Sequence, residues 1–241
     1  MMSLSEEWAI LSSKMYGQEY IEELAELLSA NDVESLIECG CGDGNVLKGL
    51  ANEGFSCVGI DGSAEMISRA LKYNNHPNIS YHQLNWLELD SLSTKFDAVI
   101  CRGNSLCVVN AWEKPIEEFD PENARKDVVL SINKFFEKIS PGGLIYIDIT
   151  SRSEIERGSM SFKLKVEDID MDCIIDHDWN KRLRTTTGAG TVCGTYFSAV
   201  NASLLMDVEE LEEIITQFKP SRTWRPEMKY EVNYDVLCVK K

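Results

Sequence analysis

The stretch Leu36-Ile37-Glu38-Cys39-Gly40-Cys41-Gly42-Asp43-Gly44-Asn45 decides the fold of this chain. Its first residues are apolar, its three glycines alternate, and a segment with helical periodicity follows. Glycine lacks a Cβ, so its backbone can turn tightly and approach a ligand closely. The stretch therefore predicts a strand, a ligand-cradling turn and a helix, although a purely structural strand-to-helix turn would also use glycine.

Short apolar runs alternate with amphipathic stretches on both sides of this turn. Their periodicity predicts helices at 16–28, 46–52, 64–72 and 124–139, and strands at 33–39, 55–60, 79–84, 96–102 and 144–149. Ser63 is expected to cap the third helix, and Pro141-Gly142-Gly143 to stop the fourth. This alternation predicts an α/β fold with a doubly wound, mostly parallel sheet.

The residue pattern changes after the fifth predicted strand. Between residues 159 and 202 strand-forming residues dominate, at 162–166, 173–179, 184–187 and 192–200. We expect an antiparallel insertion of two hairpins that covers the ligand side of the sheet. A helix from Asp207 to Phe218, with Glu210 completing a capping box, and strands at 222–224 and 232–239 then close a seven-stranded sheet.

The charge of the chain restricts its partners. It carries 40 acidic and 24 basic residues, a net charge of −16, and such a surface repels nucleic-acid phosphates. No apolar run approaches the roughly 20 residues of a membrane span. Acidic residues follow the first methionines, where a secretory signal would carry basic ones. We therefore expect a cytoplasmic protein without nucleic-acid or membrane partners.

The chain has eight cysteines and three histidines. The cysteines form no Cys-x-x-Cys pair, and several lie in apolar runs. They are expected to be buried free thiols in a reducing compartment, and no metal site is expected.

Asp61 ends the second predicted strand, 21 residues after Gly40. A carboxylate at that position can accept both hydroxyls of a ribose. The third glycine, Gly44, comes one residue earlier than dinucleotide-binding loops require, because Asn45 stands at their third glycine position. Glu38 would sit badly beside a pyrophosphate, whereas it suits a cofactor that carries an ammonium and a sulfonium. The pattern favours S-adenosylmethionine over a nicotinamide or flavin cofactor.

These residues resemble the class I S-adenosylmethionine-dependent methyltransferases, whose first motif is acid-x-Gly-x-Gly-x-Gly. The stretches 85–90, 96–106 and 140–148 resemble the glycine N-methyltransferase branch, which includes the bacterial glycine/sarcosine enzymes. The similarity covers about residues 16–149. It implies S-adenosylmethionine as cofactor, a small-molecule acceptor and one methyltransferase domain over residues 1–241, with 159–202 as its lid. It leaves homo-oligomer formation open.

The resemblance also implies roles for single residues. Asp61 would hold the ribose, Met66 and residues 85–87 would surround the adenine, and Asn104 would face the transferable methyl group as the catalytic candidate. The implied cofactor-binding residues are Tyr16, Glu38, Cys39, Gly40, Gly42, Gly44, Asp61, Gly62, Met66, Asn85, Trp86, Leu87, Arg102, Gly103 and Ser105. Two of them, Tyr16 and Trp86, have an equally simple alternative as packed core aromatics.

The acceptor-side candidates are Asn104, Arg152, Trp112 and Tyr196. In the resembling enzymes an arginine soon after strand five clamps a substrate carboxylate. Here Thr150 stands at the aligned position, so Arg152 is either that clamp or a solvent-facing residue. Trp112 and Tyr196 are either pocket or core residues.

The sequence leaves several functions open. A neutral amine needs no dedicated base, which favours N-methylation. An oxygen acceptor, a hydroxyl or a carboxylate, would usually need a base or a metal; the candidate bases are Asp176, His177 and Asp178. A non-catalytic S-adenosylmethionine-binding protein and, last, a nicotinamide oxidoreductase are the remaining alternatives.

Overall fold

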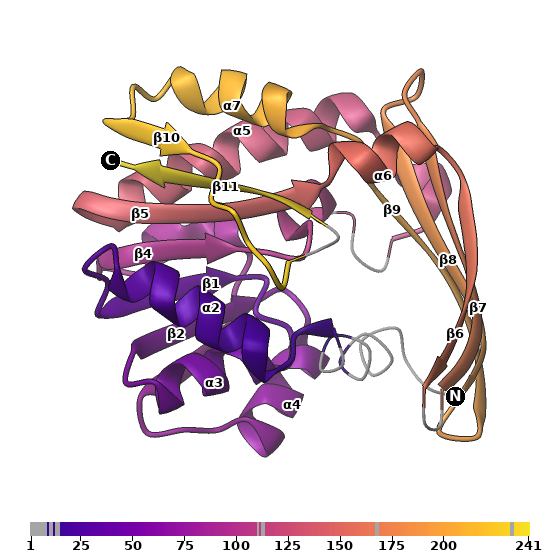
Figure 1. Ribbon diagram of the computed structural model, residues 1–241, viewed down its shortest axis with the longest axis horizontal. Coiled ribbons are helices and arrows are strands. Elements are labelled where there is room, and N and C mark those ends of the chain that lie inside the picture. Colours follow the sequence, from indigo (N-terminus) through magenta and orange to yellow (C-terminus); the bar gives the residue numbers. More distant parts are fainter. Residues whose placement is uncertain are drawn as a thin grey trace.

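A seven-stranded sheet forms the centre of the molecule (Figure 1). The computed structural model describes residues 9, 12, 15–109, 111, 114–166, 169–231 and 234–241. The strand order of the sheet is β10-β11-β5-β4-β1-β2-β3. Its strands are β1 (Ser35–Cys39), β2 (Ser56–Asp61), β3 (Ile79–Gln83), β4 (Phe96–Cys101), β5 (Ile139–Thr150), β10 (Arg222–Trp224) and β11 (Tyr234–Lys240).

The direction of these strands confirms the expected doubly wound α/β fold. Strands β1 to β5 pair in parallel, whereas β11 runs antiparallel to β5 and β10 runs antiparallel to β11. The order reverses at β1, from which the chain winds outward first to β3 and then through β4 to β5. Ligands of open parallel sheets bind at this reversal, outside the carboxyl ends of the strands.

Helices cover both faces of the sheet (Figure 1). One face is covered by α2 (Gln18–Ser29), α3 (Asn45–Asn52) and α4 (Ala64–Tyr73), and the other by α5 (Pro121–Lys138) and α7 (Val208–Thr216). Three short 3₁₀ helices complete the connections: η1 (Trp86–Ser91), η2 (Ser105–Val108) and η3 (Ile116–Glu118). No helix in the described part of the chain is long and apolar enough to cross a membrane.

The ends of the helices follow local capping chemistry. Ser63 caps α4 as expected, since its hydroxyl accepts from the Met66 amide. Helix α5 begins at Pro121 rather than at residue 124, because Asp120 caps it and proline is favoured in the first turn. Asp207 caps α7, but the carboxylate of Glu210 pairs with Arg125 at 2.9 Å and with Arg182, instead of closing a capping box.

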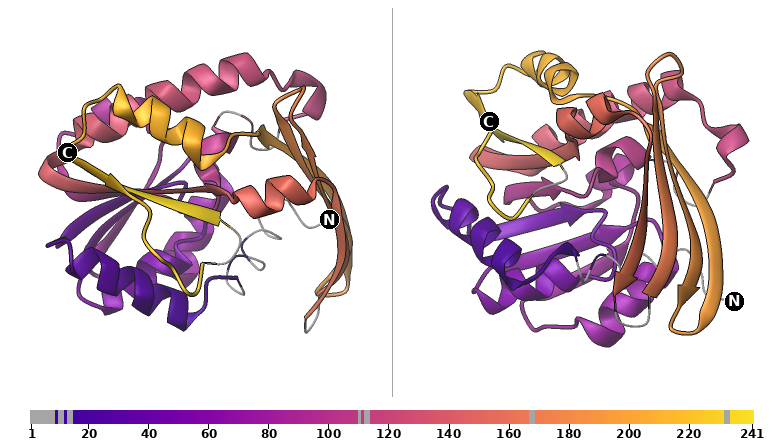
Figure 2. Two further views of the ribbon diagram at one scale, coloured as in Figure 1. Left: turned by 45° about the horizontal axis from the view of Figure 1, so that its top comes forward. Right: turned by 45° about the vertical axis from the view of Figure 1, so that its right-hand side comes forward.

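The insertion is one four-stranded antiparallel sheet in the order β6-β7-β8-β9. Its strands are β6 (Met160–Val166), β7 (Ile169–Asp178), β8 (Leu183–Val192) and β9 (Thr195–Leu204). The strand expected at 192–200 is interrupted, because Cys193 and Gly194 adopt positive φ values of 49° and 75° and turn the chain. This sheet curves across from the carboxyl ends of the parallel strands (Figure 2).

A short helix that the sequence analysis did not predict, α6 (Arg152–Arg157), connects β5 to the insertion. Ser151 caps it by accepting from the Glu154 amide. The helix is only one and a half turns long, too short for its periodicity to stand out in a sequence.

All eight cysteines are free thiols. Seven are buried, as expected from their apolar surroundings, whereas Cys193 is exposed in the turn between β8 and β9.

Candidate active site

The glycine loop joins β1 to α3 and tolerates no side chain at two of its glycines. Gly40 has a φ of 78°, and a Cβ there would lie 3.1 Å from the Ser105 side chain. Gly44 has a φ of 76° as the N-cap of α3, and a Cβ there would lie 2.3 Å from the hydroxyl of Tyr81. L-residues with a side chain avoid this left-handed region. Both the close neighbours and the positive φ values therefore favour glycine at these two positions of the loop.

Asp61 lies at the end of β2 beside this loop. Its Oδ2 accepts from the Gly42 amide at 2.9 Å and its Oδ1 accepts from the Ser63 amide at 2.8 Å. The carboxylate thus faces the loop and holds its backbone. The adjacent Gly62 has no atom within 4 Å of where its Cβ would stand, so the backbone beyond Asp61 is open.

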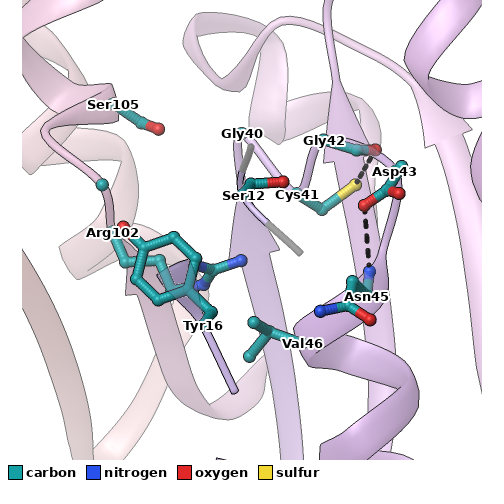
Figure 3. A pocket seen from close by; sticks show the side chains of 11 residues that line it. Ser12, Tyr16, Gly40, Cys41, Gly42, Asp43, Asn45, Val46, Arg102 and Ser105 are labelled. Atoms are coloured by element: carbon teal, nitrogen blue, oxygen red, sulfur yellow. Dashed lines mark hydrogen bonds between the residues drawn. The ribbon is translucent and has the colours of Figure 1, made fainter. Parts of the chain in front are cut away.

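A cavity lies over the loop (Figure 3). It brings together six of the residues selected from the sequence: Tyr16, Gly40, Gly42, Arg102, Gly103 and Ser105. Ser12, Cys41, Asp43, Asn45 and Val46 complete the lining. The residues therefore come from before α2, from the glycine loop with the start of α3, and from the end of β4.

A buried ion pair stands at one wall of the cavity. Glu38 at the end of β1 pairs with Arg102, which follows β4, and their side chains are 1% and 9% exposed. The Arg102 guanidinium also lies 4.3 Å from the centroid of the Tyr16 ring (Figure 3). Burial raises the pKa of Glu38 to about 7, and the charge of Arg102 opposes that rise. Burial alone would lower the pKa of Arg102, but Glu38 raises it overall, so Arg102 stays cationic.

The residues expected around an adenine do not line this cavity. Trp86 is buried below Gly40, and its indole N–H donates to the Ser131 hydroxyl at 3.1 Å. Asn85 accepts from the Leu87 amide at 2.9 Å and caps η1. Met66 is buried in α4. Trp86 thus has the packing of a core aromatic and also supports the loop.

Asn104 and Asp148 form a hydrogen-bonded unit at the carboxyl ends of β4 and β5. The Asn104 amide donates to Asp148 Oδ1 at 2.9 Å, and Asn104 Oδ1 accepts from the Thr150 amide at 3.2 Å. Asp148 is fully buried, and burial raises its pKa to about 6. Among the residues that the structure describes, its Oδ2 has no hydrogen-bond partner, and neither does the Thr150 hydroxyl.

Sequence reasoning missed Asp148 as a functional candidate. The signal was present, because an acid stands inside the apolar run 144–149. A carboxylate in such a run is costly to bury unless it is paired or used.

The structure places two of the acceptor-side candidates on the surface. Arg152 lies on the surface in α6, 61% exposed, and pairs with Glu156 at 3.0 Å and Glu209 at 3.7 Å. Tyr196 is 66% exposed on β9. It points away from the face that buries its neighbour Phe197, because successive strand residues face opposite sides. Trp112 lies outside the described residues.

The three candidate bases of the insertion have different surroundings. Asp176 is exposed, and Asp178 pairs with Lys181 at 3.2 Å. His177 is partly buried, its Nδ1 lies 3.0 Å from the Gly158 carbonyl oxygen, and burial lowers its pKa.

Comparison with known proteins agrees with this architecture. Residues 36–121 match the family described as a methyltransferase domain. The chain is 31% identical to the glycine N-methyltransferase of Mus musculus over 140 residues, 54% of this chain and 45% of that protein. It therefore spans about half the length of the curated relatives it matches.

Solved structures share the whole fold. CalS10, an amino pentose methyltransferase from Micromonospora echinaspora solved with S-adenosylmethionine bound, gives a TM-score of 0.73 at 16% identity over 100% of this chain and 98% of its own. The sugar N-methyltransferase KedS8 from Streptoalloteichus gives 0.73 at 16% identity over 100% and 94%. Together with the sheet order, these findings show that the chain shares the fold of S-adenosylmethionine-dependent methyltransferases, and the family match over residues 36–121 includes the glycine loop.

Proposed function

We propose that this protein transfers a methyl group from S-adenosylmethionine to the nitrogen of a small-molecule amine. One observation carries the proposal: the fully buried Asp148, next to Asn104 at the carboxyl edge of the sheet, has an oxygen, Oδ2, for which the described residues provide no hydrogen-bond partner. A buried carboxylate with a free acceptor position suits an ammonium group. The glycine N-methyltransferase relative and the sugar N-methyltransferase neighbour support a nitrogen acceptor.

The residues over the glycine loop suit the cofactor. Arg102 stays cationic at the cavity wall and would pair with the carboxylate of the methionine part. Asp61 would accept the ribose hydroxyls while keeping the Gly42 amide, because a carboxylate has about four lone-pair sites. The Ser105 side chain, which follows β4, packs against Gly40 of the loop. When bound, S-adenosylmethionine supplies a methyl group activated by a positively charged sulfur.

Asp148 and Asn104 would prepare the acceptor. With a pKa of about 6, Asp148 is mostly ionised at neutral pH and can hold an ammonium group. It can also take the proton that the nitrogen must lose before its lone pair attacks. Hydrogen bonds at both the amide and the side chain of Asn104 fix its position beside that carboxylate. Fixed orientation of the reacting nitrogen is worth about 7–11 kcal/mol in favourable cases.

Calorimetric titration with S-adenosylhomocysteine tests the cofactor site. Asp61→Ala should weaken binding by about 1.5–3 kcal/mol, the cost of losing charged hydrogen bonds. Asp90→Ala is the matched control, because that carboxylate is 67% exposed on η1. Equal binding by wild type and Asp61→Ala would contradict the proposed grip on the ribose.

Product analysis tests the acceptor. Panels of amines, alcohols and carboxylic acids are incubated with S-adenosylmethionine, and methylated products are identified by mass spectrometry. N-methylated products support the proposal, whereas O-methylated products alone overturn the choice of nitrogen. Tight cofactor binding without turnover on any panel would indicate a non-catalytic binding protein.

A further inference from the structure

Three polar residues form one cross-strand row on the β6–β9 sheet. His177 lies opposite Arg184, and Arg184 lies opposite Ser203, so all three side chains share one face. We call them the polar row. Two of them have a buried atom without a hydrogen-bond partner in the described part of the chain: Arg184 Nε and Ser203 Oγ. Buried polar atoms are rarely left unpaired, so an unpaired group in a native structure calls for an explanation such as a ligand or water.

The polar row faces the carboxyl edge of the main sheet. Strand β9 packs against η2, and the β6–β9 sheet stands across from the ends of the parallel strands (Figures 1 and 2). Burial raises the pKa values of Cys107 in η2 and of Tyr234 at the start of β11, and the charge of Arg184 opposes both rises. Tyr234 pairs across the sheet with Thr150, the residue whose hydroxyl is unpartnered.

Most arginines in the described part of this acidic protein pair with a carboxylate, and Arg184 does not. Within the described ranges, carboxylates pair with six other arginines: Arg102, Arg125, Arg152, Arg157, Arg182 and Arg225. Arg184 has no such ion pair among these residues, and its Nη1 donates to the neutral Thr186 hydroxyl at 2.9 Å. A partly buried guanidinium without an acidic partner is suited to bind a carboxylate or phosphate from outside the chain.

We propose that Arg184, with Ser203 beside it, binds an anionic group of the methyl acceptor. This inference rests on the proposed function and narrows its substrate class to amines that also carry a carboxylate or a phosphate. The amine would lie toward Asp148 and the anionic group toward the polar row. Arg184 is then a specificity-determining residue, and it lies on β8 whereas the exposed Arg152 lies in α6.

Anion binding can be measured without turnover. Line broadening of ¹³C-labelled acetate and of inorganic phosphate in NMR spectra is recorded with the purified full chain, with and without saturating S-adenosylhomocysteine. Wild type should broaden at least one of the two signals, and which one separates a carboxylate from a phosphate acceptor. Arg184→Gln should weaken that affinity about tenfold or more, as loss of a charged hydrogen bond does.

Two further variants serve as controls for this measurement. Arg184→Lys keeps the charge and should retain part of the affinity. Lys163→Gln removes the same charge from the opposite face of the sheet, where Lys163 is 57% exposed, and should bind both probes as wild type does. Equal broadening by wild type and Arg184→Gln, or no broadening by wild type, would overturn the proposal.

Folding is checked by thermal unfolding of each variant. If Arg184→Gln does not fold, Ser203→Ala replaces it, with a severalfold loss of affinity expected and unchanged affinity counting against the site. The titration with S-adenosylhomocysteine distinguishes failure of the cofactor site from failure of the Arg184 site. Normal S-adenosylhomocysteine binding without Arg184-dependent anion binding refutes only this inference, whereas the reverse result refutes only the cofactor site.

Discussion

Glu38 and Arg102 form a buried ion pair that joins the ends of the neighbouring strands β1 and β4 at the cavity over the glycine loop. Arg102 also lies against the Tyr16 ring, so one guanidinium connects β1, β4 and the segment before α2. Breaking a buried pair from one side leaves the other charge uncompensated in a medium that solvates it poorly.

At about pH 8, above the pKa of about 7 at which Glu38 ionises, Glu38→Gln should therefore lower the free energy of unfolding by about 3–5 kcal/mol. Urea denaturation followed by circular dichroism measures it. Glu156→Gln breaks an Arg–Glu pair at the surface, where both partners are more than half exposed, and should hardly change stability. Similar effects of the two substitutions would mean that the buried pair does not stabilise the site.

The stability contributed by Asp148 should depend on pH. Its pKa is about 6 in the folded protein, against an ordinary value of 3.8. Between these values the folded state binds more protons than the unfolded state, so stability falls as pH rises from about 4 to about 6 and is level above.

Asp148→Asn should remove this slope. The difference in unfolding free energy between wild type and the variant should change by at most about 3 kcal/mol across that range. Urea titrations at several pH values measure it, and parallel curves for the two proteins would contradict the raised pKa. Methyl transfer by wild type should fall below about pH 6, where Asp148 becomes protonated.

Two glycines of the loop should respond differently to alanine. Gly42→Ala places a Cβ in open space, so it should cost only the strain of the left-handed backbone, about 1–2 kcal/mol. Gly44→Ala adds a clash with the Tyr81 hydroxyl and should cost more. Thermal unfolding compares the two, and equal losses would show that the Tyr81 contact does not restrict the loop.

Arg152→Ala and Tyr196→Ala should leave kcat/KM for the amine acceptor within about twofold of wild type, because both side chains are exposed and lie outside the proposed acceptor site. Steady-state assays of methyl transfer measure this. A tenfold loss in either variant would return that residue to the acceptor site and would require the β6–β9 sheet or α6 to move during binding.

The sequence by itself predicted most of the elements, their order and the glycine loop with Asp61 beside it. Hydrophobic period and turn residues are local properties, so the strand, the glycine loop and Asp61 could be read in succession. The short helix α6 and the β8–β9 turn escaped because each depends on a few residues with weak periodicity. The capping box at Glu210 failed because two distant arginines compete for its carboxylate.

Only the tertiary structure decided which charges meet. Glu38 and Arg102 are 64 positions apart, and Asp148 is joined to Asn104 across two strands. Arg152 and Arg184 look alike in the sequence, but Arg152 lies in an exposed helix among acids, whereas Arg184 lies on a strand and has no ion pair with any described carboxylate. Electrostatic roles depend on burial and on neighbours brought together by folding, and neither is encoded in local spacing.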